Sequence, residues 1–203
     1  MKRLIIYELN EVPPRLLKKY IQKNPKSSIA KIFKNGIYKV TTTRDNGELH
    51  PWSTWPTVHR GVNNKLHNIR YINQDLTSAD KKYPPVWQIL EKNNIDIGIF
   101  GTLQSYPPRS SKNYHFYIPD TFAPNKKTYP ESLNSFQEFN LQLANENKAQ
   151  SNNISLKSFL LFFKLILSGN ISKISVLKIL VHMVREIINK DYKKRRSFIQ
   201  NLL

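Results

Sequence analysis

The chain has 203 residues, which is enough for one domain with a core, with or without an appendage. It contains no cysteine, so disulfides, thiolate zinc sites and cysteine nucleophiles are excluded. Lys and Arg number 32 against 14 Asp and Glu, and the resulting formal charge of +18 favours anionic partners.

Strands and helices alternate in the first part of the chain. The apolar run at 3–9 predicts a buried strand, and two prolines then open a helix expected at 15–22. A second helix is expected at 28–34, because its apolar pattern ends at Asn-Gly, a common helix stop. The β-branched and aromatic residues at 37–43 predict the next strand.

The same alternation continues after a polar loop. We expect a helix at 55–62, an irregular polar stretch at 63–82 and a helix at 86–93 behind another proline pair. Residues 95–100 predict a third strand, and 114–118 an edge strand. This order predicts an α/β fold with a mostly parallel sheet flanked by helices, which we assign to a domain spanning 1–129.

From residue 130 the pattern becomes helical, which predicts an α-helical cap or insertion at 130–203. Helices are expected at 131–147, 156–167 and 171–190, with a short polar linker at 150–153 and a basic cluster at Lys193-Lys194-Arg195-Arg196. The most apolar run within these helices is far shorter than the ~20 residues that span a bilayer.

One hydroxyl stands out by its position in the chain. Thr54 directly precedes Trp55-Pro56, and proline is favoured at the first position of a helix. Thr54 is therefore predicted at a loop-to-helix junction, beside free backbone N–H groups and the positive end of the helix. That environment suits a phosphate or sulfate ester, and a hydroxyl placed there could attack the ester.

This segment resembles the alkaline phosphatase superfamily, and it is most similar to the type I phosphodiesterase/nucleotide pyrophosphatase branch. Members carry Thr-aromatic-Pro, then Thr-Gly, and His-Gly-Ile six residues after that glycine. The counterparts here are Thr54-Trp55-Pro56, Arg60-Gly61 and His67-Asn68-Ile69. Arg60 replaces the threonine of the family and Asn68 replaces its second glycine, whereas the spacing from Gly61 to His67 matches.

The resemblance implies a phosphodiesterase-like chemistry with two divalent ions, usually zinc, that acts on phosphate or, less favoured, sulfate esters of small molecules. It makes Thr54 both the nucleophile and a metal ligand. Asn10 falls where the family has a metal-binding Asp, although a neutral amide is a poorer ligand. The later ligands of the family, an Asp-x-x-x-His pair, an Asp-His pair and a last His, are not found. The resemblance covers about residues 1–150, and it implies an incomplete domain that is inactive as this chain alone.

Two further residues are candidates for binding substrate. His67 closes the segment that follows the predicted nucleophile helix, and it either lines the substrate or has a structural role. Asp120, in Pro119-Asp120-Thr121-Phe122, is either a pocket carboxylate or the first residue of an Asx-type turn.

A second class of function stays open. Cationic residues surround the apolar faces of the C-terminal helices, so the chain is alternatively a non-catalytic basic module that binds an anionic polymer or an anionic membrane surface. Nucleic acid is a less favoured partner, because no RNA-binding signature or zinc-knuckle spacing is present. The N-terminus has no signal-peptide pattern, which leads us to expect a cytoplasmic protein.

Overall fold

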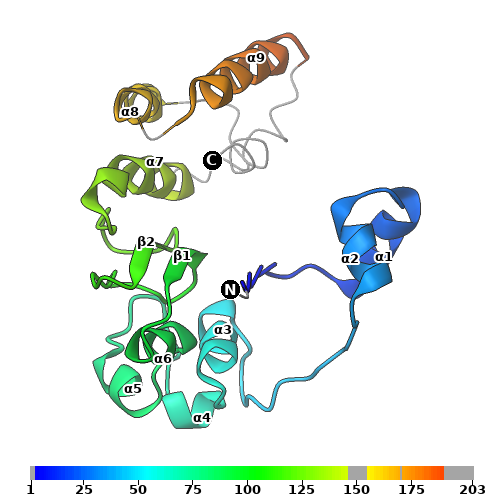
Figure 1. The fold of residues 1–203 in the computed structure, drawn as a ribbon, viewed down its shortest axis with the longest axis vertical. Coiled ribbons are helices and arrows are strands. Elements are labelled where there is room, and N and C mark those ends of the chain that lie inside the picture. Colours follow the sequence, from blue (N-terminus) through cyan, green and yellow to red (C-terminus); the bar gives the residue numbers. More distant parts are fainter. Residues whose placement is uncertain (1–2, 146–154, 170, 190–203) are drawn as a thin grey trace.

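The computed structural model of the chain describes residues 3–145, 155–169 and 171–189 (Figure 1). The fold is α/β, with many helices around a two-stranded parallel sheet. In chain order the elements are α1 (Pro14–Lys23), α2 (Ser28–Asn35), α3 (Pro51–Arg60), α4 (Asn64–His67), α5 (Thr77–Lys82), α6 (Val86–Lys92), β1 (Ile97–Thr102), β2 (Tyr114–Pro119), the 3-10 turn η1 (Glu131–Leu133), α7 (Asn134–Asn145), α8 (Leu156–Leu167) and α9 (Lys173–Asn189).

The helix boundaries follow from local capping chemistry. Ser27 caps α2, where its side chain accepts a hydrogen bond from the N–H of Ala30 at 3.3 Å. Asn63 caps α4 in the same way, through the N–H groups of the first turn. At the end of α3, Gly61 adopts a left-handed φ of 66° and its N–H donates to the carbonyl of Thr57. The predicted helices at 15–22, 28–34 and 86–93 are confirmed to within two residues at each end.

The sheet consists of β1 and β2, which pair in parallel, as the sequence predicts for this part of the chain. One face packs on α6, where Trp87 joins Ile97, Ile99, Tyr114 and Tyr117 in the largest buried cluster of the α/β part. At Gly98 the ring of Phe116 approaches so closely that an added Cβ would lie 2.4 Å from it. A larger residue at this position of β1 would require the Phe116 ring, which is 39% exposed, to move aside.

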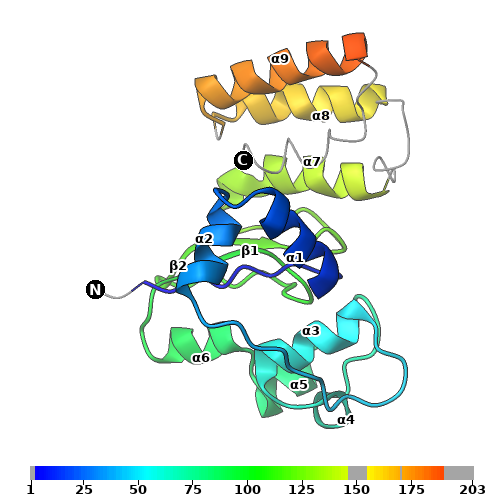
Figure 2. The ribbon, with the colours of Figure 1, turned by 90° about the vertical axis from the view of Figure 1, so that its right-hand side faces the viewer.

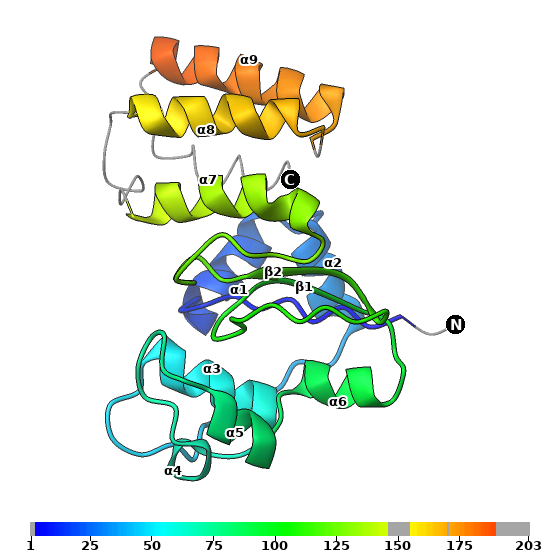
Figure 3. The same ribbon diagram turned by 90° about the vertical axis from the view of Figure 1, so that its left-hand side faces the viewer.

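α7 lies over the other face of the sheet, as the views in Figures 1 and 3 agree, and this face stays partly exposed. Phe100 of β1 lies 5.6 Å from Phe136 of α7 between ring centroids. Gln137 is fully buried, and its amide donates to the carbonyls of Pro119, the last residue of β2, and of Asp120, the next residue. These two bonds fix α7 to the carboxyl end of the strand, because a buried amide left without partners would be costly.

The predicted all-helical pattern after residue 130 is confirmed for the described residues. Phe139 of α7, Phe162 and Leu165 of α8 and Ile179 of α9 form one buried cluster. Figures 2 and 3 show α8 and α9 alongside each other, on the side of α7 that faces away from the sheet. No helix of the described residues is long and apolar enough to cross a membrane. The linker at 150–153 and the basic cluster Lys193-Lys194-Arg195-Arg196 lie outside the described residues.

Two predicted strands are wrong, and the sheet is narrower than expected. Segments 3–9 and 37–43 are not strands in the structure, and their apolar side chains are open to solvent, for example 87% for Ile5 and 89% for Ile37. A β-branched run becomes a strand only where a neighbouring strand takes up its backbone hydrogen bonds. β1 pairs with β2 alone in the described residues, so these segments stay outside the sheet.

The helix pair between those segments is nearly free of the rest of the molecule. α1 buries no residue and α2 buries only Ala30, and Figure 1 shows the pair standing apart from the sheet. The stretch at 63–82, predicted to be irregular, instead contains the short helices α4 and α5. Both are too short for a periodic apolar pattern to reveal them.

Candidate functional site

A cavity of about 480 Å³ lies where the parallel strands end. Its walls come from the carboxyl ends of β1 and β2, the start of α3 and the N-terminal segment. Ligands of α/β folds commonly bind at the carboxyl ends of parallel strands. The polar side chains that line this cavity are Glu8, Asn10, Glu11, His50, Asp120 and Thr121.

A second cavity, of about 350 Å³, adjoins the first one. Asn10 and Glu11 line both cavities, and Thr54 lines the second. The N-terminal segment is joined to α3 by the Trp55 indole N–H, which donates to the Asn10 side-chain oxygen at 3.0 Å. The structure therefore brings together the predicted nucleophile and the predicted ligand, although they are far apart in the chain.

The predicted location of Thr54 at the helix start is wrong. α3 begins at Pro51, with His50 as its cap, so Thr54 is the fourth helical residue. Its N–H and its hydroxyl both donate to the carbonyl of His50, at 2.9 and 3.1 Å. Two prolines in this segment can open a helix, and the chain uses the first of them.

Pro56 is consequently inside α3, where it has no N–H to give to the carbonyl of Trp52. The side-chain amide of Gln104 takes that role and donates to the Trp52 carbonyl at 3.2 Å and to the Tyr71 carbonyl at 2.7 Å. Gln104 itself adopts a left-handed φ of 59°. The residue was not singled out from the sequence, because nothing in the chain pattern links it to a proline in another helix.

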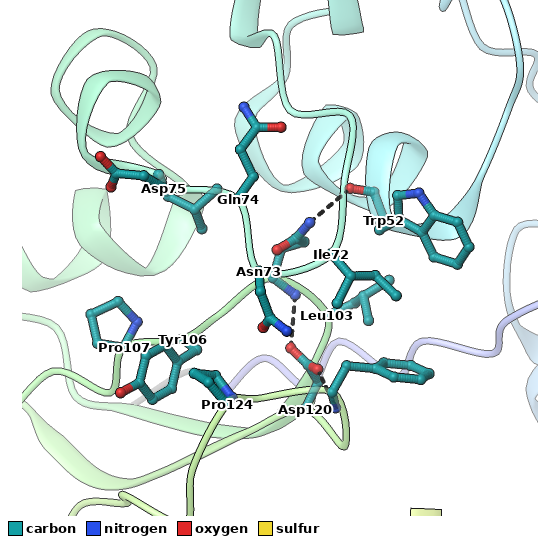
Figure 4. Close-up of a pocket in the computed structure, with 13 residues that line it drawn as sticks. Trp52, Ile72, Asn73, Gln74, Asp75, Leu103, Tyr106, Pro107, Asp120 and Pro124 are labelled. Atoms are coloured by element: carbon teal, nitrogen blue, oxygen red, sulfur yellow. Dashed lines mark hydrogen bonds between the residues drawn. The ribbon is translucent and has the colours of Figure 1, made fainter. Parts of the chain in front are cut away.

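Asp120 lies at the wall between the 480 Å³ cavity and a smaller one of about 190 Å³. In Figure 4, which shows the smaller cavity, the Trp52 and Tyr106 side chains lie on different sides and Asp120 lies along the lower edge. The carboxylate accepts from the N–H of Phe122 at 2.8 Å, the i to i+2 bond of an Asx turn, and from the N–H of Gln104 at 2.9 Å. Burial raises the pKa of this carboxyl, and its backbone partners oppose that shift.

His67 does not line these cavities and is held in a different polar cluster. Its Nδ1 accepts from the N–H of Ile69 at 3.0 Å, so the proton resides on Nε2, which lies 3.0 Å from the hydroxyl of Thr57. That hydroxyl donates to the Asp45 carboxylate, which also accepts from the N–H of Asn64. Burial lowers the His67 pKa to about 4, against the opposing effect of Asp45, so the ring is neutral. This cluster ties the loop before α3 to α4.

The side chains that line these cavities are a poor set of ligands for a metal ion. The described residues hold no group of three or more His, Cys, Asp and Glu that could bind an ion. The nearby oxygens also have other partners, since Asn10 accepts from Trp55 and Glu8 lies 2.8 Å from the Nε2 of His59. The described residues do not fit a two-ion zinc centre by themselves.

Comparisons with protein-family models, curated proteins and solved structures found no match. The resemblance to the alkaline phosphatase superfamily therefore stays a prediction that depends on the residues quoted for it.

Two of the departures from the pattern of that superfamily, at Asn68 and Arg60, have distinct structural surroundings. Asn68, which replaces a glycine, ends α4 with a left-handed φ of 51°. Glycine favours that conformation and asparagine tolerates it better than most residues, so the exchange keeps the backbone. Arg60 replaces a threonine. Its buried guanidinium donates to the Asp80 carboxylate and to the carbonyl of Tyr83, both at 2.6 Å.

Glu11 lies in the site next to Asn10, although it was given no role from the sequence. It lines both cavities and has a left-handed φ of 53°, which is uncommon for a residue other than glycine. The sequence offers a turn after 3–9 as the only signal for it. A carboxylate in the same cavity as Thr54 is a candidate proton acceptor.

Proposed function

We propose that this chain carries the part of an active site that holds the nucleophile of a hydrolase or transferase acting on phosphate esters, with Thr54 as the attacking hydroxyl. The observation that supports the proposal most is the shared cavity of Asn10 and Thr54. The two residues are the ones that the sequence pattern pairs, and the Trp55 indole links their segments through a 3.0 Å hydrogen bond.

The backbone after α3 gives a second line of support. Gly61 and Asn68 both have left-handed φ values, at the two positions where the superfamily pattern has glycine. Such positions are restricted to glycine and a few polar residues, so their spacing is a property of the backbone as well as of the sequence.

The chemistry of the cavity follows from its side chains. An ester phosphorus in the 350 Å³ cavity would meet the Thr54 hydroxyl, which must give up its proton to attack. At rest that proton is donated to the His50 carbonyl of the same helix, a bond that has to be released. Glu11 lines the same cavity, and its carboxylate is the group we assign to accept the proton.

The proposal assigns only two metal donors to this chain, the side-chain oxygens of Asn10 and Thr54. A pair of divalent ions would stabilise the attacking and leaving oxygens in a complete site of this class. Because the described residues do not form such a centre, we expect this chain to bind a phosphate ester with little turnover.

A binding experiment tests the role of Thr54. Bis(4-nitrophenyl) phosphate is titrated into the labelled chain while the amide and indole NMR signals are followed, and we expect the Trp55 indole and the Thr54 amide to shift. Thr54→Ala removes one hydroxyl partner of the ligand, so affinity should fall about threefold to tenfold.

Thr42→Ala is the matched control, because Thr42 is exposed in the segment before α3 and lines neither cavity. It should bind the diester like the unchanged chain. Equal affinities of the Thr54→Ala and Thr42→Ala variants, or shifts confined to α7–α9, would refute the proposed site.

A further inference from the structure

The outermost helices of the molecule expose an unusual amount of apolar surface. On α8 five large apolar side chains are exposed, and they fall on one stripe because they recur at three- and four-residue intervals. They are Leu156, Phe159, Leu160, Phe163 and Leu167, with exposed fractions from 42% to 83%. The inward stripe of α8, with Phe162 and Leu165, is already filled by the buried cluster.

α9 repeats the arrangement. Its inward contact is made by Ile179, which is 1% exposed, while a second stripe remains open. The members of that stripe are Ile174, Leu177, Val181, Val184 and Ile188, with exposed fractions from 44% to 71%. Exposed apolar surface of this extent marks an interaction site in a folded protein.

Charge decides which partner fits. Residues 155–189 contain five Lys and Arg and one Glu. All five cations are exposed, and within the described part of the chain only Lys164 pairs with a carboxylate, that of Glu138 at 2.8 Å. They are Lys157 and Lys164 on α8, and Lys173, Lys178 and Arg185 on α9.

We propose that the α8–α9 layer docks on an anionic phospholipid bilayer, with the two apolar stripes in the interface and the cations at the headgroups. Helices with an apolar face of Leu and Phe and a border of Lys and Arg bind bilayers in this way without crossing them. A second copy of the chain is the poorer occupant, because it would bring the same excess of positive charge to the contact. The proposal is independent of Thr54 and of any ester chemistry.

Vesicle sedimentation of the full chain tests the proposal. Vesicles of phosphatidylcholine with about one third phosphatidylglycerol should retain the chain, and vesicles of phosphatidylcholine alone should retain far less. Leu160→Glu with Leu177→Glu places charges in both stripes, so partitioning should fall more than about tenfold. Ile32→Glu, at a 67% exposed position of α2, is the matched control and should leave partitioning within about twofold.

The charge contribution is measured separately. Changing Lys157, Lys178 and Arg185 to Gln should weaken binding about fivefold for each charge removed. The same change at Lys19, Lys31 and Lys34, which are exposed on α1 and α2, should have a clearly smaller effect. Circular dichroism and the melting temperature confirm that each variant is folded.

Three results would overturn the proposal. The first is equal retention of the chain by neutral and anionic vesicles. The second is an equal loss of vesicle binding in the two sets of variants that remove cations. The third is absence of vesicle binding together with a dimer in sedimentation equilibrium that Leu160→Glu with Leu177→Glu dissociates. The last result would assign the two stripes to a second copy of the chain.

Discussion

Changing Asp80 to asparagine is expected to lower the free energy of unfolding by about 3 kcal/mol, because it leaves a buried guanidinium without its counter-charge. The Arg60 side chain is 2% exposed, and its terminal nitrogens bond to Asp80 and to the Tyr83 carbonyl. Its Nε has no partner among the described residues, so no further hydrogen bond of the guanidinium offsets the loss of the Asp80 charge. The carboxylate is 30% exposed, which lets water relieve part of the loss and sets the estimate at the lower end of the range for buried pairs.

The measurement is a urea unfolding curve for each variant, with the melting temperature expected to fall by about 8 °C. Asp96→Asn makes the same chemical change in an exposed pair, since Asp96 and His115 are 52% and 68% exposed. It should cost less than about 1 kcal/mol. If both variants unfold at the same urea concentration, the Arg60–Asp80 pair does not hold α3 to α5.

The longer helices could be located from the sequence, because their signals are local, whereas the short helices α4 and α5 fell in a stretch that was predicted to be irregular. Prolines at 13–14 and 84–85, Ser27 and the Asn35-Gly36 stop act on residues a few positions away. The parallel pairing of β1 and β2 was accessible for the same reason, since two apolar runs lie close together in the chain. The start of α3 was misplaced because its segment offers two prolines that can open a helix, Pro51 and Pro56.

The strands at 3–9 and 37–43 could not be settled from sequence, because a strand is a property of a pair. Their composition is typical of strands, yet the described residues offer them no ladder partner. The exposure of Ile5, Ile37 and Val40 is therefore the physical consequence of a strand-like sequence without a neighbour.

The candidate site shows the same division between local and distant information. Thr54 and Asn10 were named from the sequence, and Asn10 reaches the α3 segment through a hydrogen bond to Trp55. Gln104 was not named, and Glu11 was given no role in the site, because their contributions depend on backbone at φ values above zero and on groups from other elements. His67 was named, but its neighbours Asp45 and Thr57 hold it away from the two cavities that Asn10 lines.

That placement of His67 makes stability depend on pH. Burial lowers the His67 pKa to about 4, from the 6.5 of the unfolded chain. Between these pH values the unfolded chain binds the proton and the folded chain does not, so protons favour unfolding. The contribution of a neutral His67 is fully present above pH 6.5 and is lost progressively as the pH falls toward 4. The shift corresponds to about 2 to 3 kcal/mol.

Unfolding free energies of the wild type and of His67→Gln, measured from pH 7.5 to 4.5, isolate this effect. The other titrating groups cancel in the difference between the two chains, so wild type should lose about 2 kcal/mol relative to the variant over this range. His115→Gln removes a histidine that is 68% exposed, and its difference from wild type should stay nearly constant with pH. A flat difference for His67→Gln would mean that the pKa of His67 is the same in the folded and the unfolded chain, so that the ring becomes protonated in the folded chain as the pH falls through 6.5. A protonated Nδ1 cannot accept the Ile69 N–H, so this hydrogen bond would then not hold the ring in its neutral form.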